Sequence, residues 1–195
     1  MLENYNKMIW CIVPKNTPFV IRHCSKCNKK MEYYCSEKFR MNGNHTRLDI
    51  WLIYKCPKCN TTLKLTIDKG IKPHDISSEL FDCFTHNDVK LAWKYAFDRN
   101  FLHQNNCVVQ YANVKYHIQG FEPQKWDSNT IIHLKSKYFF DLKLSVVLSG
   151  IIGISISKLK NIVDLISVSP TCDIIKYRIK SDIELFIQPL EKILN

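Results

Sequence analysis

Four cysteines in two closely spaced pairs are the residues of this sequence best suited to chemistry. Cys24 and Cys27 are separated by two residues, and so are Cys56 and Cys59. This spacing lets both thiolates of a pair point into one tight turn, with backbone amides directed at the sulfurs. Two such turns supply four sulfur ligands, which is the tetrahedral set that structural zinc prefers. We therefore expect one structural Zn²⁺ per chain, bound by these four cysteines.

Other interpretations of the cysteines fit less well. A redox-active pair would be a single C-x-x-C at the end of a strand in a βαβ unit. A catalytic zinc site keeps three protein ligands and one open position, whereas four cysteines close the shell. His23, His45 and Cys35 lie close in sequence and remain open as replacement ligands. The five cysteines outside the two pairs are expected to be buried thiols: Cys11, Cys35, Cys83, Cys107 and Cys172.

The segments around the two pairs have the pattern of a zinc ribbon. Residues 30–39, 48–54 and 61–67 are rich in aromatic or β-branched residues or alternate in polarity, which favours strands. The sequence Asn42-Gly43-Asn44 favours a tight hairpin turn between the first two. The expected order is therefore turn, strand, hairpin, strand, turn and strand over residues 1–75.

Further along the chain, the pattern changes to mixed helix and strand. An apolar stripe over residues 89–97 predicts a helix whose start is capped by Thr85, with Asp88 three residues on, or by Asn87. Residues 104–119 favour a strand and 120–129 a loop. Beyond it we expect a strand at 130–138, a helix that Asp141 caps and Gly153 ends, a short helix after Ser155 or Ser157, and strands at 167–169, 174–179 and 183–187.

These elements predict an α+β fold in three parts. Residues 1–75 form the β-rich zinc ribbon, 76–128 a helical connector with a strand, and 129–195 a small α/β module. The 195 residues are long enough to bury a core without disulfide bonds. The start of the chain lacks the pattern of a secretory signal, and no apolar run reaches the roughly 20 residues of a membrane span. We therefore expect a soluble, cytoplasmic protein with no membrane partner.

Positive charge is concentrated in the first part of the chain. The formal net charge is +10 overall, with +8 in residues 1–75, −1 in 76–130 and +3 in 131–195. Such a concentration favours an anionic partner, although part of it can serve the negatively charged metal shell. Tyr33, Tyr34 and Trp51 are the aromatic residues near this charge, and the apolar strand around Trp51 predicts that it lies in the core.

Most of the chain resembles an uncharacterised bacterial family catalogued as domain of unknown function 1062. The resemblance rests on Trp10 and Pro18 and on residues 22–27, 39–42, 48–59, 87–88, 91–92 and 95–98. The block Leu-Asp-Ile-Trp-Leu-Ile-Tyr at 48–54 makes it specific. The family implies no activity.

The C-terminal part is similar to the ribosomal-protein-S-four-like RNA-binding domain. Residues 143–148, 155–163 and 179–185 carry the similarity, but Lys143, Ser145, Ile156 and Ser181 depart from that domain's pattern. The similarity implies phosphate contacts, which would position RNA without specifying sequence. The candidate nucleic-acid contacts in the whole chain are Lys143, Lys158, Lys160, Lys29, Lys30 and Arg40.

Together these features predict a non-enzymatic, zinc-binding protein that contacts RNA or a ribonucleoprotein. The chain contains no Gly-rich phosphate loop, no H-E-x-x-H, no Ser-centred nucleophile elbow and no carboxylate pair that would indicate an enzyme. The alternative is a protein–protein adaptor in which the ribbon is a rigid platform with aromatic anchors.

Overall fold

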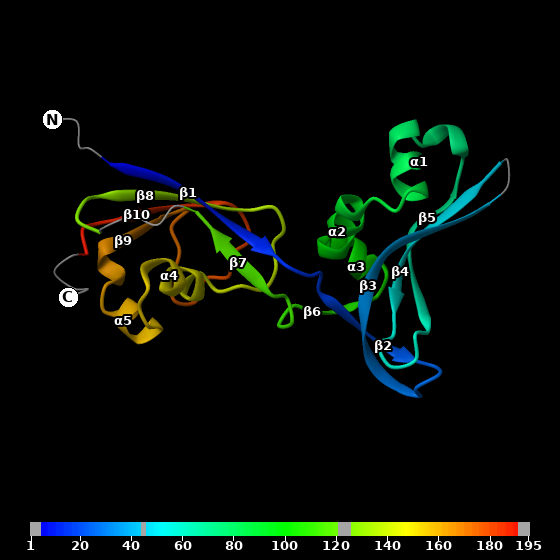
Figure 1. The fold of residues 1–195 in the computed structure, drawn as a ribbon, viewed down its shortest axis with the longest axis horizontal. Coiled ribbons are helices and arrows are strands. Elements are labelled where there is room, and N and C mark those ends of the chain that lie inside the picture. Colours follow the sequence, from blue (N-terminus) through cyan, green and yellow to red (C-terminus); the bar gives the residue numbers. More distant parts are fainter. Residues whose placement is uncertain (1–4, 44–45, 121–125, 191–195) are drawn as a thin grey trace. The chain divides into compact units, whose positions relative to one another are not determined.

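The computed structural model describes residues 5–43, 46–120 and 126–190 and divides the chain into two compact units (Figure 1). One unit is Asn16–Val114, which we call the central unit. The other combines Met1–Lys15 with Lys115–Asn195, and we call it the terminal unit. Each contains one five-stranded sheet. No helix in the described parts of the chain has the length and apolar character needed to cross a membrane.

The central unit is built on an antiparallel sheet with strand order β5-β4-β3-β2-β6. Its strands are β2 (Phe19–Cys24), β3 (Lys29–Gly43), β4 (Leu48–Lys55), β5 (Thr62–Ile71) and β6 (Val108–Gln110). The predicted strands at 30–39, 48–54 and 61–67 are therefore present. The register of β3 against β4 shifts between Cys35 and Lys38, where Glu37 has a positive φ of 57°.

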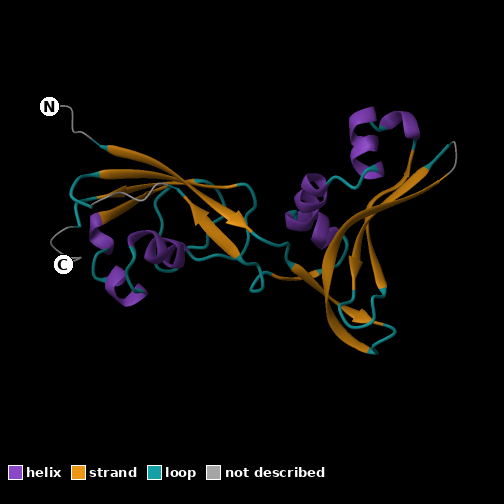
Figure 2. Cartoon of the chain, in the orientation of Figure 1, coloured by secondary structure: helices purple, strands orange, loops and turns teal. Residues whose placement is uncertain are grey.

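The helices of the central unit pack against one face of its sheet (Figure 2). They are the 3₁₀ turn η1 (Pro73–Asp75), α1 (Ser78–Thr85), α2 (Val89–Phe97) and α3 (Arg99–Gln104). The predicted stripe on α2 is confirmed, since Ala92 and Ala96 are buried against Leu52 and Leu65. The predicted cap at Thr85 or Asn87 is wrong: Asp88 caps α2, and its side chain accepts from the Leu91 amide at 2.6 Å. Alternation along the strands directs the other half of their side chains to the opposite face, where none of the described helices of this unit packs.

The terminal unit brings the N-terminal strand into a sheet with the C-terminal part of the chain. Its strand order is β7-β1-β8-β10-β9. The strands are β1 (Asn6–Pro14), β7 (Tyr116–Gln119), β8 (Thr130–Ser136), β9 (Ile166–Ser169) and β10 (Ile183–Ile187). β1 pairs parallel to β8 and antiparallel to β7, and it buries Trp10 and Ile12.

Two helices, α4 (Leu144–Ile152) and α5 (Ile156–Lys160), and the 3₁₀ turn η2 (Val163–Leu165) complete the terminal unit. Gly153 ends α4 with a φ of 77°, as its position predicts, because only glycine enters this region without strain. The Ser155 side chain caps α5 by accepting from the Lys158 amide at 3.2 Å. The predicted Asp141 cap is wrong: Lys143 occupies the cap position of α4, and the Asp141 carboxylate pairs with Arg178 instead.

The two units cut across the three ranges expected from the sequence, 1–75, 76–128 and 129–195. Residues 6–14 leave the expected ribbon because β1 finds its partners in β7 and β8. The expected connector is divided, since its helices and β6 complete the central unit while β7 joins the terminal sheet. The mixed α and β content agrees with the α+β class.

Two smaller expectations have different outcomes. The strand expected at 174–179 is reduced to an isolated bridge between Lys143 and Arg178, and Asp173 instead caps a turn by accepting from the Ile175 amide. The hairpin expected at Asn42-Gly43-Asn44 includes one position outside the described residues, and half of the loop expected at 120–129 lies outside them.

Candidate metal centre

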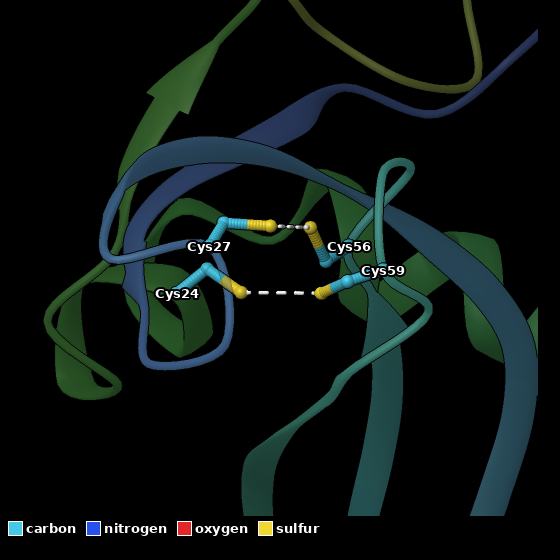
Figure 3. Close-up of side chains that lie close together, drawn as sticks. All are labelled: Cys24, Cys27, Cys56 and Cys59. Carbon is cyan, nitrogen blue, oxygen red and sulfur yellow. Dashed lines mark hydrogen bonds between the residues drawn. The ribbon is translucent and has the colours of Figure 1, made fainter.

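The four predicted cysteine ligands meet at one end of the sheet of the central unit (Figure 3). The Sγ atoms of Cys24 and Cys59 are 3.4 Å apart, and those of Cys27 and Cys56 are 3.8 Å apart. All four sulfurs lie within 4.8 Å of one another. A tetrahedral site with metal–sulfur bonds of about 2.3 Å has sulfurs about 3.8 Å apart. The observed cluster therefore has the size of a four-thiolate metal shell.

A pair of disulfide bonds does not explain this cluster. Disulfide sulfurs are bonded at about 2.05 Å, well below both distances between the paired sulfurs. All four cysteines are free. Two of the sulfurs, those of Cys24 and Cys56, belong to buried residues, and those of Cys27 and Cys59 to partly exposed ones.

Each cysteine pair lies in a turn that ends at an asparagine in the left-handed backbone region. Asn28, which follows Cys27, has a φ of 50°, and Asn60, which follows Cys59, has a φ of 59°. Asparagine accepts this conformation more readily than other residues with a Cβ. The second turn is closed by the Asn60 amide, which donates to the Cys56 carbonyl at 2.9 Å. The reversal at each asparagine returns the chain into β3 or β5.

Hydrogen bonds to two of the sulfurs favour their thiolate forms. The Tyr33 hydroxyl on β3 bonds Cys24 and is the main reason that the pKa of this thiol falls to about 6. The backbone amide of Cys27 adds a second bond to the same sulfur. At Cys59, the Thr61 hydroxyl at 3.0 Å and the Thr61 amide lower the pKa of the thiol. A thiolate accepting such bonds is prepared to bind a cation.

The Cys27 thiol holds its proton more firmly than an ordinary cysteine. Burial raises the pKa of its thiol to about 12, and the negative charge of Cys24 acts in the same direction. Burial also raises the pKa of Tyr33, so its hydroxyl stays protonated and keeps donating. A metal cation at this position would displace the Cys27 proton, because four sulfurs this close cannot all ionise without a counter-charge.

Sequence reasoning missed the residues that support the four ligands. The repeated pattern Cys-x-Lys-Cys-Asn at 24–28 and 56–60 is a local signal that points to Asn28 and Asn60. Tyr33 gave no such signal, because its orientation toward Cys24 depends on the pleat of β3. It is 2% exposed and does not lie on the surface among the accessible aromatic residues.

The other residues considered as ligands lie elsewhere. Cys35 is buried in the core beneath the helices, where burial raises the pKa of its thiol to about 12. His23 is exposed, and His45 lies outside the described residues. Among the remaining cysteines the expectation of burial is wrong, because only Cys35 is fully buried. The partly exposed ones are Cys11, Cys83, Cys107 and Cys172.

The six lysines and arginines expected to contact nucleic acid fall in both units. Lys29, Lys30 and Arg40 are exposed on β3 of the central unit, and alternation places Lys30 and Arg40 on its helix-free face. Lys143, Lys158 and Lys160 are exposed in the terminal unit, at the start of α4 and along α5. Lys158 and Lys160 are two residues apart on a helix and so do not face the same way.

Comparison with known proteins gives a family without a function. A family model described as a protein of unknown function, DUF1062, matches residues 41–172. The match contains Cys56 and Cys59, whereas Cys24 and Cys27 precede it. No curated protein and no solved structure matches the chain.

Proposed function

We propose that this chain, which belongs to the DUF1062 family of proteins of unknown function, is a non-enzymatic RNA-binding protein built on a structural zinc centre. The ligand set supports zinc as the metal. Four cysteine thiolates in a shell of tetrahedral size suit Zn²⁺ better than magnesium or calcium, which take oxygen ligands. We expect one Zn²⁺ per chain, in the reducing cytoplasm, where free thiols persist.

The closed shell supports a structural role for the metal. Catalytic zinc sites keep one coordination position for water or substrate, and four cysteines leave none. The four ligands join the β2–β3 turn to the β4–β5 turn, so the metal would fix the relative position of all four strands. Its contribution is then to folding, because ligands of this kind are brought together only in the folded chain.

The observation that carries the RNA proposal is the charge on the sheet that the metal would hold together. Lys30, Lys38 and Arg40 on β3, Lys55 on β4 and Lys64 on β5 share the face opposite the helices. Positive charge gathered on one face of a stable sheet is the footprint of an anionic polymer. Lys143, Lys158 and Lys160 add exposed positive charge in the terminal unit.

The test is a filter-binding titration of the zinc-loaded chain with RNA at two salt concentrations. With five phosphate contacts, affinity should fall about 100-fold between about 50 and about 200 mM monovalent salt. No binding at the lower salt, or an affinity that does not change with salt, would contradict the proposal. A protein partner captured at high salt after nuclease treatment would favour the adaptor alternative.

A further inference from the structure

The helix-free face of the central sheet has a regular arrangement of side chains in three rows. Register places Tyr34, Lys55 and Thr62 in one row, Lys38, Ile53 and Lys64 in the next, and Arg40, Trp51 and Thr66 in the third. Neighbouring strands are about 4.8 Å apart, and successive rows on β4 are about 6.8 Å apart. We call these nine residues together with Lys30 the open face.

The charge of the open face is not neutralised by its neighbours. Among the described residues, none of the five basic side chains of the open face forms an ion pair with a carboxylate. Two acidic residues share this face by alternation: Glu32 lies on β3 between Lys30 and Tyr34, and Asp49 lies on β4 beyond the row of Trp51. Asp49 is also engaged, because its carboxylate accepts from the Gly70 amide at 2.7 Å.

The other acidic residues of these strands face the helices. Glu37, at the irregularity of β3, accepts from the indole N–H of Trp93 on α2 at 2.6 Å. Asp68 on β5 lies near Tyr95 of α2, where its charge contributes to the raised pKa of that phenol. The three rows therefore carry Lys38, Arg40, Lys55 and Lys64 without a carboxylate among them.

Two aromatic side chains lie among these cations. Tyr34 is 37% exposed. Trp51 is partly exposed, whereas the sequence predicts that it lies in the core. The Lys64 ammonium lies 4.7 Å from the centroid of the Trp51 ring. The sequence prediction was wrong because the apolar run at 48–54 includes both faces of β4, and Trp51 has the parity opposite to Ile50 and Leu52.

Lysine and arginine side chains beside aromatic rings, as on the open face, suit one class of ligand. Single-stranded nucleic acids offer phosphates for lysine and arginine and unpaired bases that stack on aromatic rings. A duplex hides its base faces in its own stack, and the broad face of a sheet does not fit into a groove as a helix or a two-stranded ribbon does.

We propose that the open face binds single-stranded nucleic acid, with Lys38, Arg40, Lys55 and Lys64 on phosphates and with Tyr34 and Trp51 stacking on bases. This inference rests on the proposed function and names its ligand and contact residues. Neither phosphate contacts nor base stacking reads the 2′-hydroxyl, so RNA and DNA strands of one sequence should bind alike.

The experiment is fluorescence anisotropy of the full-length, zinc-loaded chain with a labelled oligonucleotide of ~12 nucleotides. The probe is presented as single-stranded RNA, as single-stranded DNA and as a duplex. The charge variant is Lys38→Ala with Arg40→Ala, and its matched control is Lys90→Ala with Lys94→Ala on α2, which removes the same charge from exposed positions on the helical side. The stacking variants are Tyr34→Leu and Trp51→Leu, with circular dichroism and zinc content to show that each is folded.

The single-stranded probes should bind at least about 10-fold more tightly than the duplex. Lys38→Ala with Arg40→Ala should reduce the slope of log affinity against log salt by about 1.4, since each phosphate contact contributes about 0.7. The control pair should change neither affinity nor slope. Each stacking variant should weaken binding by about 5- to 100-fold with little change in slope.

Several results would overturn the inference. One is an equal loss of affinity in the charge variant and its control, and another is equal affinity for the duplex and the single-stranded probes. A more than about 10-fold preference for RNA over DNA or the reverse, or folded stacking variants with unchanged affinity, would also contradict it. If wild type binds RNA but these residues have no effect, only this inference fails. If wild type binds no RNA at low salt, the proposed function fails as well.

Discussion

Lys64 on β5 holds its ammonium 4.7 Å from the centre of the Trp51 ring on β4, on the side of the central sheet away from the helices. Such a contact at a partly exposed site contributes about 0.5–1 kcal/mol. The Trp51 side chain is itself partly exposed. The same sheet carries the cysteine cluster at its end, so the accessible ring and the candidate metal centre belong to one unit.

Tyr33→Phe should weaken metal binding without removing a ligand. The hydroxyl bonds the Cys24 sulfur and is the main cause of its lowered pKa, so its loss makes that sulfur a poorer ligand. Substitutions of groups that support a metal ligand in this way weaken affinity by about 10- to 100-fold. Competition with a chromogenic chelator measures the change. Tyr34→Phe is the control, because its exposed ring lies on the other face; an equal loss in both variants would contradict the assignment.

Asn28 and Asn60 should tolerate glycine but not alanine. Both have a positive φ, which alanine adopts at a penalty of about 1 kcal/mol or more. We therefore expect Asn28→Ala and Asn60→Ala each to lower the unfolding free energy of the zinc-loaded chain by about that amount, and the glycine variants to restore most of it. Urea unfolding followed by circular dichroism measures this difference. Alanine variants as stable as the glycine ones would show that the turns do not impose this conformation.

Metal binding should release protons and weaken in acid. At neutral pH the raised pKa of Cys27 keeps that thiol protonated, so binding should release at least about one proton per metal. In the metal-free chain, the Cys24 thiolate stabilises the fold fully above its ordinary pKa of 9.0, and this contribution is lost as pH falls toward about 6. Zinc titration in weak buffer with a pH indicator measures the protons. Zinc affinity independent of pH between about 5 and 8 would contradict thiolate ligation.

Removing the metal should loosen the central unit selectively. All four cysteines belong to Asn16–Val114, and none of the clustered sulfurs comes from the terminal unit. Chelation should therefore increase hydrogen exchange of β2, β3, β4 and β5, while β8 and β10 keep their protection. Exchange followed by mass spectrometry at peptide level separates the two sheets. Equal loss of protection in both would show that the metal stabilises the chain as a whole.

How much of this structure the sequence predicts depends on how far apart in the sequence the interacting residues lie. The cysteine turns and the strands beside them depend on local spacing and alternation, so they could be expected. The parallel pairing of β1 with β8 joins Asn6 to Thr130, and no local pattern encodes such a partner. Trp51 was misplaced because an apolar run does not show which of its residues face the helices. Tyr33 was missed because its contact with Cys24 crosses from one strand to the next.

The most direct test of the metal centre is zinc analysis with X-ray absorption on the full-length chain purified without added metal. The account predicts one zinc per chain with four sulfur neighbours at about 2.3 Å. Cys24→Ser and Cys59→Ser should lose zinc together with the fold of the central unit, whereas Cys83→Ser, at a partly exposed position on α1, should keep both. A folded wild-type chain without metal, or zinc bound by nitrogen or oxygen in place of four sulfurs, would contradict it.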